Sequence, residues 1–257
     1  MQSVFDELYE NSLAKCEFKN LISIITAEEN IRLAYRNLKK NAGSRTPGTD
    51  GKTIADLAKM SEPELIGFVQ QKFNWYQPQS VRRKEIPKGN GKTRPLGIPT
   101  IMDRLIQQCV LQVMEPICEA KFCETSNGFR PNRGVENALA QAEKHMQKSN
   151  LHIVIDIDIK GFFDNVNHGK LLRQIWAMGI HDKKLLSIIS AMLKAEVAGI
   201  GFPEKGTPQG GILSPLLSNI VLNELDWWIT SQWVGMPTRH EYSGKIHENG
   251  TKDQSKK

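Results

Sequence analysis

Two acidic residues, Asp156 and Asp158, stand in a stretch whose residue types could bind metal ions. Across residues 152–159, isoleucines alternate with other residues, which is the period of two expected of a strand with one packed face. Asp158 ends this predicted strand just before a turn, where a carboxylate could hold a divalent cation. Nucleotidyl transfer commonly uses two magnesium ions about 3.5–4 Å apart, so this chemistry is one interpretation. Taken alone, the same pattern is more often an exposed strand face.

A second set of chemically capable residues lies on a β-hairpin predicted over residues 81–99. The sequence Gly89-Asn90-Gly91 suits the tight turn that would join its two extended segments. Against one acidic residue, Glu85, the hairpin carries Arg82, Arg83, Lys84, Lys88, Lys92 and Arg94. Such a hairpin could bind phosphate groups, and the alternative is a basic hairpin that only faces solvent.

The elements that must position these residues are mainly helical. Apolar residues recur at intervals of three and four over residues 4–40 and, with a break, over 54–73, whereas turn-forming residues crowd the loop 41–51 between them. Thr100 with Asp103 resembles a capping box before the next helix. Further helices are predicted near residues 134–145, 171–176, 185–193 and 214–228.

The composition limits the class of protein. With 257 residues and a net charge of +6, the chain could bury a sizeable core and attract a polyanion such as nucleic acid, although charge alone fits any soluble basic protein equally well. The cysteines lack the spacing of a zinc site, which favours buried free thiols in a reducing compartment. Neither a signal peptide nor a membrane span is apparent, so we expect a soluble, cytoplasmic protein with no membrane partner.

Five segments, in this order along the chain, resemble successive motifs of group II intron reverse transcriptases. They are GTDG at residues 48–51, IPKGNGKTRPLGIPT at 86–100, GFRP at 128–131, DIDIKGFFD at 156–164 and GTPQGGILSP at 206–215. One such motif would be weak, but the ordered set, reaching over residues 45–226, is specific. The resemblance implies an α+β fold, namely the fingers and partial palm of a right-hand polymerase, mainly helical with a small antiparallel sheet and a basic β-hairpin.

The resemblance also implies a function. The protein would be an RNA-directed DNA polymerase, which carries out nucleotidyl transfer, encoded by a retroelement. It would also bind intron RNA and assist the splicing and mobility of the intron. The implied partners are group II intron RNA, template RNA, a DNA primer and deoxynucleoside triphosphates, and the implied cofactor is Mg²⁺. Asp158 would be the catalytic metal ligand, assisted by the backbone carbonyl of Ile159. Phe163 would pack beneath the incoming sugar, with a simple core aromatic as the alternative, and Phe162 is interpreted as a core residue.

Further roles follow from the same resemblance. Lys88 and Arg94 would clamp the triphosphate, and Gln209 would contact the nucleotide. Asp164 and His168 are interpreted as capping or turn residues. Weaker candidates for contacts with RNA or template are Arg45, Lys52, Arg82, Arg83, Lys84, Lys92 and Arg130, the last of which could equally form a structural ion pair.

The second family signature, Tyr-Ala-Asp-Asp, does not occur in the sequence. A lone aspartate with a carbonyl should hold two divalent ions poorly, so we expect the two-metal site to be incomplete and the isolated chain not to polymerise. We divide the chain into fingers with an amino-terminal extension (residues 1–150), an interleaved partial palm (151–230) and a polar tail or interrupted insertion (231–257).

Two alternatives to the polymerase stay open. One is an RNA-binding maturase module without polymerase activity, whose binding would survive loss of Asp158 because phosphate contacts need no catalytic metal. The other is a bacterial reverse transcriptase without an intron, which the GTDG and GFRP segments fit less well. Association into a homodimer through exposed apolar surface is also left open.

Overall fold

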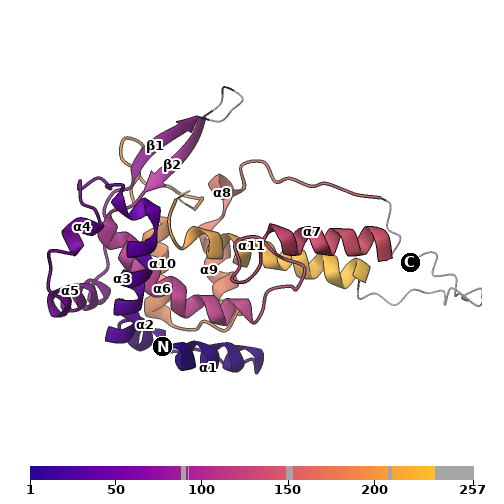
Figure 1. The fold of residues 1–257 in the computed structure, drawn as a ribbon, viewed down its shortest axis with the longest axis horizontal. Coiled ribbons are helices and arrows are strands. Elements are labelled where there is room, and N and C mark those ends of the chain that lie inside the picture. The colour runs from indigo at the N-terminus through magenta and orange to yellow at the C-terminus, as the bar shows by residue number, and fades with distance from the viewer. Residues whose placement is uncertain (88–90, 92, 149–152, 208–209, 235–257) are drawn as a thin grey trace, which may run out of the picture. The chain divides into compact units, whose positions relative to one another are not determined.

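The computed structural model describes residues 1–87, 91, 93–148, 153–207 and 210–234 (Figure 1). Two compact units divide the chain: the first comprises Met1–Phe122 and Ile159–Val221, and the second comprises Cys123–Asp158 and the described part of Leu222–Lys257. The described residues are mainly helical with one two-stranded antiparallel sheet, so the predicted α+β class is confirmed. The division into fingers and palm stays a prediction.

The first unit is built around α6 (Ile101–Glu119), whose apolar side chains are almost completely buried. Helices α1 (Gln2–Leu13), α2 (Leu21–Ile25) and α3 (Glu28–Lys40) pack against it. At the start of α6, the hydroxyl of Thr100 accepts a hydrogen bond from the backbone N–H of Asp103 at 3.2 Å, so the predicted cap is confirmed.

A buried polar contact fixes α3 on α6. The amide Nε2 of Gln112 donates to Oδ1 of Asn30 at 2.6 Å, and Nδ2 of Asn30 donates to the carbonyl of Cys109 at 3.1 Å. Asn30 is fully buried, so removing either partner would leave a buried polar group without a hydrogen bond and would destabilise the folded protein.

The loop predicted at residues 41–51 contains one 3₁₀ turn, η1 (Ala42–Arg45). Arg104 of α6 holds this turn, because its two terminal nitrogens donate to the carbonyls of Gly43 and Thr46, each at 2.7 Å. Two helices follow, α4 (Ile54–Leu57) and α5 (Glu62–Asn74), with the break that the sequence predicts between them.

The predicted hairpin forms from β1 (Arg82–Pro87) and β2 (Thr93–Ile98), which pair antiparallel with Arg82 opposite Ile98 and Pro87 opposite Thr93. Most of its turn, residues 88–90 and 92, lies outside the described residues. The remaining helices that begin in the first unit are α8 (Phe162–Asn165), α9 (His168–Ala177), α10 (Lys183–Leu193) and α11 (Ser214–Ile229).

The second unit contains α7 (Val135–Glu143), which continues into the π-helical turn η2 (Lys144–Lys148), and a further π-helical turn, η3 (Thr230–Val234). The strand predicted over residues 152–159 is wrong for the part that the structure describes, residues 153–159, which have no strand assignment. Ile153 and Ile155 are 87% and 80% exposed instead of packed. A strand needs a neighbouring backbone for its hydrogen bonds, and no described segment pairs with this one.

Within the described parts of the chain, no helix combines the length and the hydrophobicity that crossing a bilayer requires. All four cysteines are free thiols; Cys109, Cys118 and Cys123 are buried, whereas Cys16 is exposed, so the expectation of buried thiols is wrong for Cys16.

Candidate functional site

A cavity of about 220 Å³ in the first unit lies against the hairpin, α8 and the segment of residues 195–207. We call it the Phe163 cavity, because the half-buried ring of Phe163 lines it. Arg83 and Gly97 come from the hairpin, and Val197 and Lys205 come from the later segment. The structure therefore brings together three of the segments that the motif pattern singles out, at residues 86–100, 156–164 and 206–215.

The root of the hairpin is joined to the 195–207 segment by backbone hydrogen bonds. The N–H of Val81 donates to the carbonyl of Glu196 at 2.7 Å, and the N–H of Ala198 donates to the carbonyl of Val81 at 2.9 Å. These bonds make a short parallel bridge between Val81 and Val197. They fix one wall of the Phe163 cavity relative to the other.

Backbone hydrogen bonds from residues 206 and 207 fix the position of Phe163. The N–H of Thr207 donates to the carbonyl of Phe163 at 2.7 Å, and the N–H of Gly206 donates to the carbonyl of Val166 at 2.7 Å. Gly206 has a φ of +94°, and a Cβ there would lie 3.0 Å from the carbonyl oxygen of Phe163, so only glycine fits this close approach. The segment 205–207 thus fastens the turn that carries Phe163.

His168 has a positioning role that the sequence interpretation missed. It is buried, and its Nε2 donates to the carbonyl of Gly206 at 2.7 Å. The interpretation as a cap is wrong, because Asn167 caps α9 through its bond from the N–H of Lys170, while His168 is the first residue of the helix. Asp164 lies inside α8. The local sequence around Asn167 and His168 could not predict that the imidazole contacts residue 206, which lies 38 positions away.

The two faces of the hairpin carry different basic residues. Side chains alternate across a strand, and the observed register sets Arg83 with Gly97 on one face, and Arg94 with Lys84 on the other. The cavity is lined by Arg83 and not by Arg94. Arg83 is paired with Glu85 at 2.7 Å, which lowers the pKa of that carboxyl.

The segment after residue 209 approaches β2 closely. Gly210 has a φ of +108°, and a Cβ there would collide with the carbonyl oxygen of Gly97 and the side chain of Leu96. Gln209 itself, like Lys88 and Lys92, lies outside the described residues.

Asp158 is exposed, as is Asp156. Among the residues that the structure describes, no group of three or more His, Cys, Asp or Glu side chains lies together as a metal site would require. Asp158 with the backbone of Ile159 therefore does not fit a pair of divalent ions, each of which needs several oxygen ligands.

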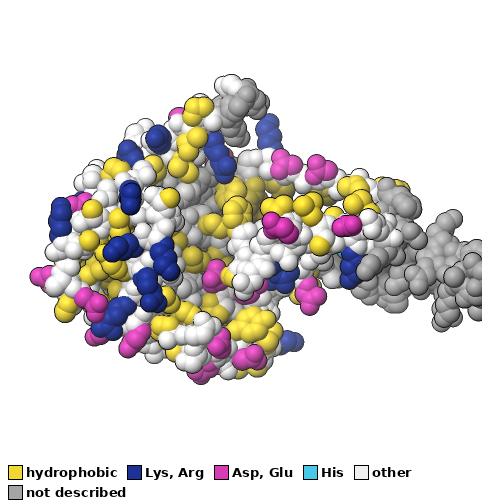
Figure 2. All heavy atoms as spheres, viewed as in Figure 1, with side chains coloured by type: hydrophobic (Ala, Val, Ile, Leu, Met, Phe, Trp, Pro, Cys, Tyr) yellow, Lys and Arg dark blue, Asp and Glu magenta, His cyan; other side chains and the backbone are white. Residues whose placement is uncertain are grey.

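The weaker candidates for RNA contact are spread over both units. Arg45, Lys52 and Lys84 are exposed, and the half-buried Arg82 has a buried Nε with no hydrogen-bond partner in the structure. Figure 2 shows Lys and Arg side chains gathered on the face that carries α3, α4, α5 and the hairpin.

Arg130 has a different environment from these exposed residues. It is only 7% exposed, and its Nη1 donates to the carbonyls of Cys123 and Ser126, both at 2.7 Å. These bonds favour the structural interpretation of this residue over a contact with template.

Residues 86–246 match the sequence profile of the family described as "Reverse transcriptase (RNA-dependent DNA polymerase)". The chain is 35% identical over 231 residues to Protein YkfC of Escherichia coli (strain K12), an alignment that covers 87% of this chain and 60% of that protein. It is 38% identical over 240 residues to the Group II intron-encoded protein LtrA of Lactococcus lactis subsp. cremoris, covering 88% of this chain and 38% of that protein. The chain thus spans less than two thirds of the length of these relatives.

Among solved structures, the chain resembles a protein in the "Partial Cas6-RT-Cas1--Cas2 complex", with a TM-score of 0.50 and 21% identity. The match covers 82% of this chain and 35% of that one. At this identity the likeness concerns the fold alone, and it agrees with the fold that the motifs imply.

Proposed function

Because the chain belongs to the reverse transcriptase family, we propose that it supplies the fingers and part of the palm of an RNA-directed DNA polymerase encoded by a group II intron. The observation that carries this proposal is the Phe163 cavity, in which the hairpin, the aromatic of the DIDIKGFFD segment and the residues before the PQGG sequence meet. Relatives that are 35% and 38% identical include a protein named for a group II intron, which supports the intron assignment.

In this proposal the cavity receives the sugar of an incoming deoxynucleoside triphosphate. Phe163 lies beneath the sugar and leaves no room for a 2′-hydroxyl, while Lys88, Arg94 and Gln209 contact the triphosphate and the base pair. We add Arg83 as a further contributor, because it is the basic side chain of the described hairpin residues that lines the cavity. A guanidinium there can donate to phosphate oxygens once it exchanges its bond with Glu85.

Asp158 is proposed as one carboxylate ligand of Mg²⁺. The described residues do not complete such a site, so the remaining ligands must come from outside them. When bound, magnesium would supply charge stabilisation for the transferred phosphoryl group. What this chain contributes at the Phe163 cavity is the placement of the nucleotide.

The same chain is proposed to bind group II intron RNA and to assist splicing in the cytoplasm. The net charge of +6 and the basic face of the first unit support binding to a polyanion. Free cysteines are consistent with a reducing compartment.

The test is primer extension on an RNA template with magnesium and deoxynucleotides. It compares the 257-residue chain with a chimera in which the chain replaces the matching region of the Lactococcus relative, a region that makes up 38% of that protein. We expect only the chimera to extend the primer, and Asp158→Ala to abolish extension while intron RNA binding persists. A chimera that binds intron RNA tightly but does not extend the primer would favour the alternative, an RNA-binding module without polymerase activity.

A further inference from the structure

A second cavity, of about 380 Å³, lies in the first unit and shares no lining residue with the Phe163 cavity. Its walls come from residues 50–60, from α5 and from the start of α6. We call it the Phe68 cavity. Apart from Lys52, which the family resemblance offers as a weak candidate for RNA contact, neither the motifs nor the proposed polymerase chemistry uses its aromatic and basic lining.

The inner wall of the Phe68 cavity is apolar and includes a flat aromatic surface. Met60, Phe68 and Met102 contribute side chains to it, and Phe68 is 39% exposed. The ammonium group of Lys72 lies over the Phe68 ring, 5.5 Å from its centre, so a cation already contacts one face of this aromatic ring. The exposed part of an aromatic ring can stack against a planar ligand.

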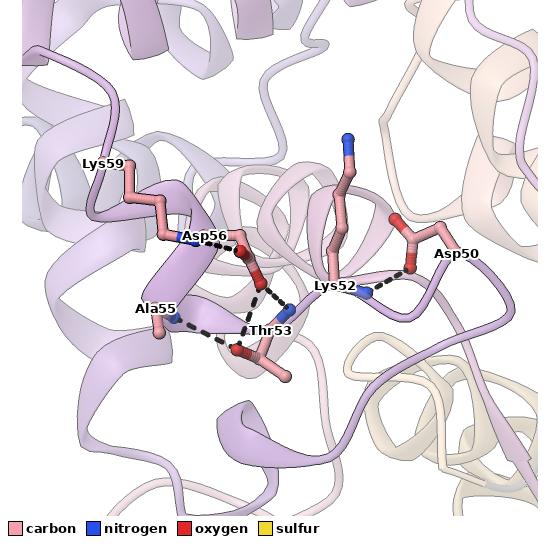
Figure 3. Close-up of polar contacts among 6 residues, drawn as sticks. All are labelled: Asp50, Lys52, Thr53, Ala55, Asp56 and Lys59. Carbon is pink, nitrogen blue, oxygen red and sulfur yellow. Dashed lines mark hydrogen bonds and ion pairs between the residues drawn. The ribbon is translucent and has the colours of Figure 1, made fainter.

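The rim of the cavity carries lysines whose charges are only partly neutralised. Lys59 is paired with Asp56 at 2.8 Å, and that carboxylate also accepts from the backbone N–H of Thr53 at 3.0 Å (Figure 3). Lys52 and Lys72 have no carboxylate within ion-pair distance among the described residues. Figure 3 shows the Lys52 side chain extending away from its turn, with no interaction drawn at its ammonium group.

The acidic side chains of the cavity are engaged by their own neighbourhood. Asp103 is buried and accepts from the hydroxyl of Tyr76 at 2.9 Å, from the N–H of Gln79 at 3.1 Å and from the hydroxyl of Thr100 at 2.7 Å. Asp50 accepts from the backbone N–H of Lys52 at 3.1 Å. The lining therefore carries both signs of charge, and the ammonium groups of Lys52 and Lys72, which form no ion pair among the described residues, are its candidate contacts for an anion.

We infer that the Phe68 cavity binds a single nucleotide that is flipped out of a folded RNA, with its base against Phe68 and its flanking phosphates on Lys52 and Lys72. A planar base with anionic groups at both ends matches a partly exposed aromatic ring beside ammonium groups that form no ion pair among the described residues. The cavity has room for one base and is too small for a duplex. RNA as the source rests on the proposed function.

The experiment measures binding of the chain to an RNA hairpin with one bulged nucleotide and to the same hairpin without the bulge. We expect tighter binding to the bulged RNA. Phe68→Leu keeps an apolar side chain but removes the stacking face, so it should weaken binding of the bulged RNA at least about five-fold and leave the unbulged RNA unchanged. Phe68→Tyr should retain the preference, and Phe202→Ala, at a 77% exposed phenylalanine outside the cavity, is the matched control.

The lysines are tested by the salt dependence of the same binding. Lys52→Gln with Lys72→Gln should reduce the slope of the logarithm of affinity against the logarithm of salt concentration, whereas Lys40→Gln should not. Equal affinity for both hairpins, or a loss by Phe68→Leu that Phe68→Tyr shares, would overturn the inference. If adenosine monophosphate binds as tightly as the bulged RNA, and this binding also depends on Phe68, the ligand of the cavity is a free nucleotide and the RNA inference is overturned.

Failure of this inference can be told from failure of the proposed function. Primer extension by the chimera reports the polymerase without reference to the bulge. If extension succeeds and the two hairpins bind equally, only the Phe68 cavity has been misassigned. If the bulge preference holds without extension, only the polymerase proposal fails.

Discussion

Two consecutive phenylalanines have different environments at the turn into α8. Phe162 packs against the hydrophobic core of the first unit, as predicted, while Phe163 lines the cavity. Their rings meet edge to face, with centroids 5.5 Å apart and planes at 74°. Phe162 thereby supports the ring of the residue that lines the cavity.

Replacing Phe163 by alanine should relax the choice of sugar. If the ring excludes the 2′-hydroxyl, Phe163→Ala should lower the ratio of deoxynucleotide to ribonucleotide incorporation by roughly 10-fold or more. The measurement is single-nucleotide primer extension by the chimera with each substrate, and Phe202→Ala serves as control. An unchanged ratio would favour the simple core interpretation of Phe163.

The hydroxyl of Tyr76 should stabilise the fold through the buried carboxylate of Asp103. Burial raises the pKa of Asp103 above its ordinary value of 3.8, and the hydrogen bond from Tyr76 opposes that rise. The folded state therefore holds the Asp103 proton more tightly than the unfolded state, and the contribution of this carboxyl to stability falls as pH rises above about 4.

The substitution Tyr76→Phe removes the hydroxyl, so it should raise the pKa of Asp103 further and enlarge the loss of stability that occurs as the pH rises. We expect the free energy of unfolding at pH 7 to fall by about 1–3 kcal/mol. The difference from the unsubstituted protein should shrink as the pH is lowered and Asp103 takes up its proton. Urea unfolding at several pH values measures both, with Tyr9→Phe as control, and a difference that does not vary with pH would contradict the assignment.

At the scale of elements, local signals predicted most of the helices and the hairpin. The cap at Thr100 and the hairpin strands depend on residues close together in sequence, and these predictions are confirmed. The strand at residues 152–159 was wrong because alternation reports which side chains would share a face, not whether another strand pairs with that segment. The bond from His168 to residue 206 could not be predicted for the same reason, since it depends on tertiary structure.

Arg104 links α6 to the loop that follows α3, so replacing Arg104 should destabilise mainly that loop. Arg104→Met keeps an apolar stem but leaves the carbonyls of Gly43 and Thr46 without their donors. We expect faster amide exchange in residues 42–46 and a free energy of unfolding lower by about 1.5–3 kcal/mol. Hydrogen exchange and urea unfolding measure the two effects. The exposed Arg36→Met is the control, and equal exchange in both variants would show that the loop does not depend on Arg104.

At the scale of the whole molecule, the second unit exposes apolar side chains that would ordinarily be covered. Ile155 and Ile157 are 80% and 73% exposed, and Trp228 is 53% exposed. Exposed apolar side chains favour association when they lie together. The homodimer stays a prediction, and these side chains are the ones to test.

Sedimentation velocity over a range of concentrations tests the homodimer. We expect a dimer fraction that rises with concentration and that falls several-fold in Ile155→Asp with Ile157→Asp, whereas Leu13→Asp in α1 of the first unit leaves it unchanged. A monomer at every concentration, or equal effects of the two changes, would remove this surface from consideration.

The backbone bridge between Val81 and Val197 also sets an order of assembly on the ribosome. Synthesis proceeds at about 5–20 residues per second, so the partner of Val81 is made on the order of ten seconds after it. The packing of α1, α2 and α3 on α6 needs only residues that are already present by then. We expect the nascent chain to fold this helical layer first and to close the Phe163 cavity last, so that translational pausing before residue 195 would yield a folded layer with no place for a nucleotide.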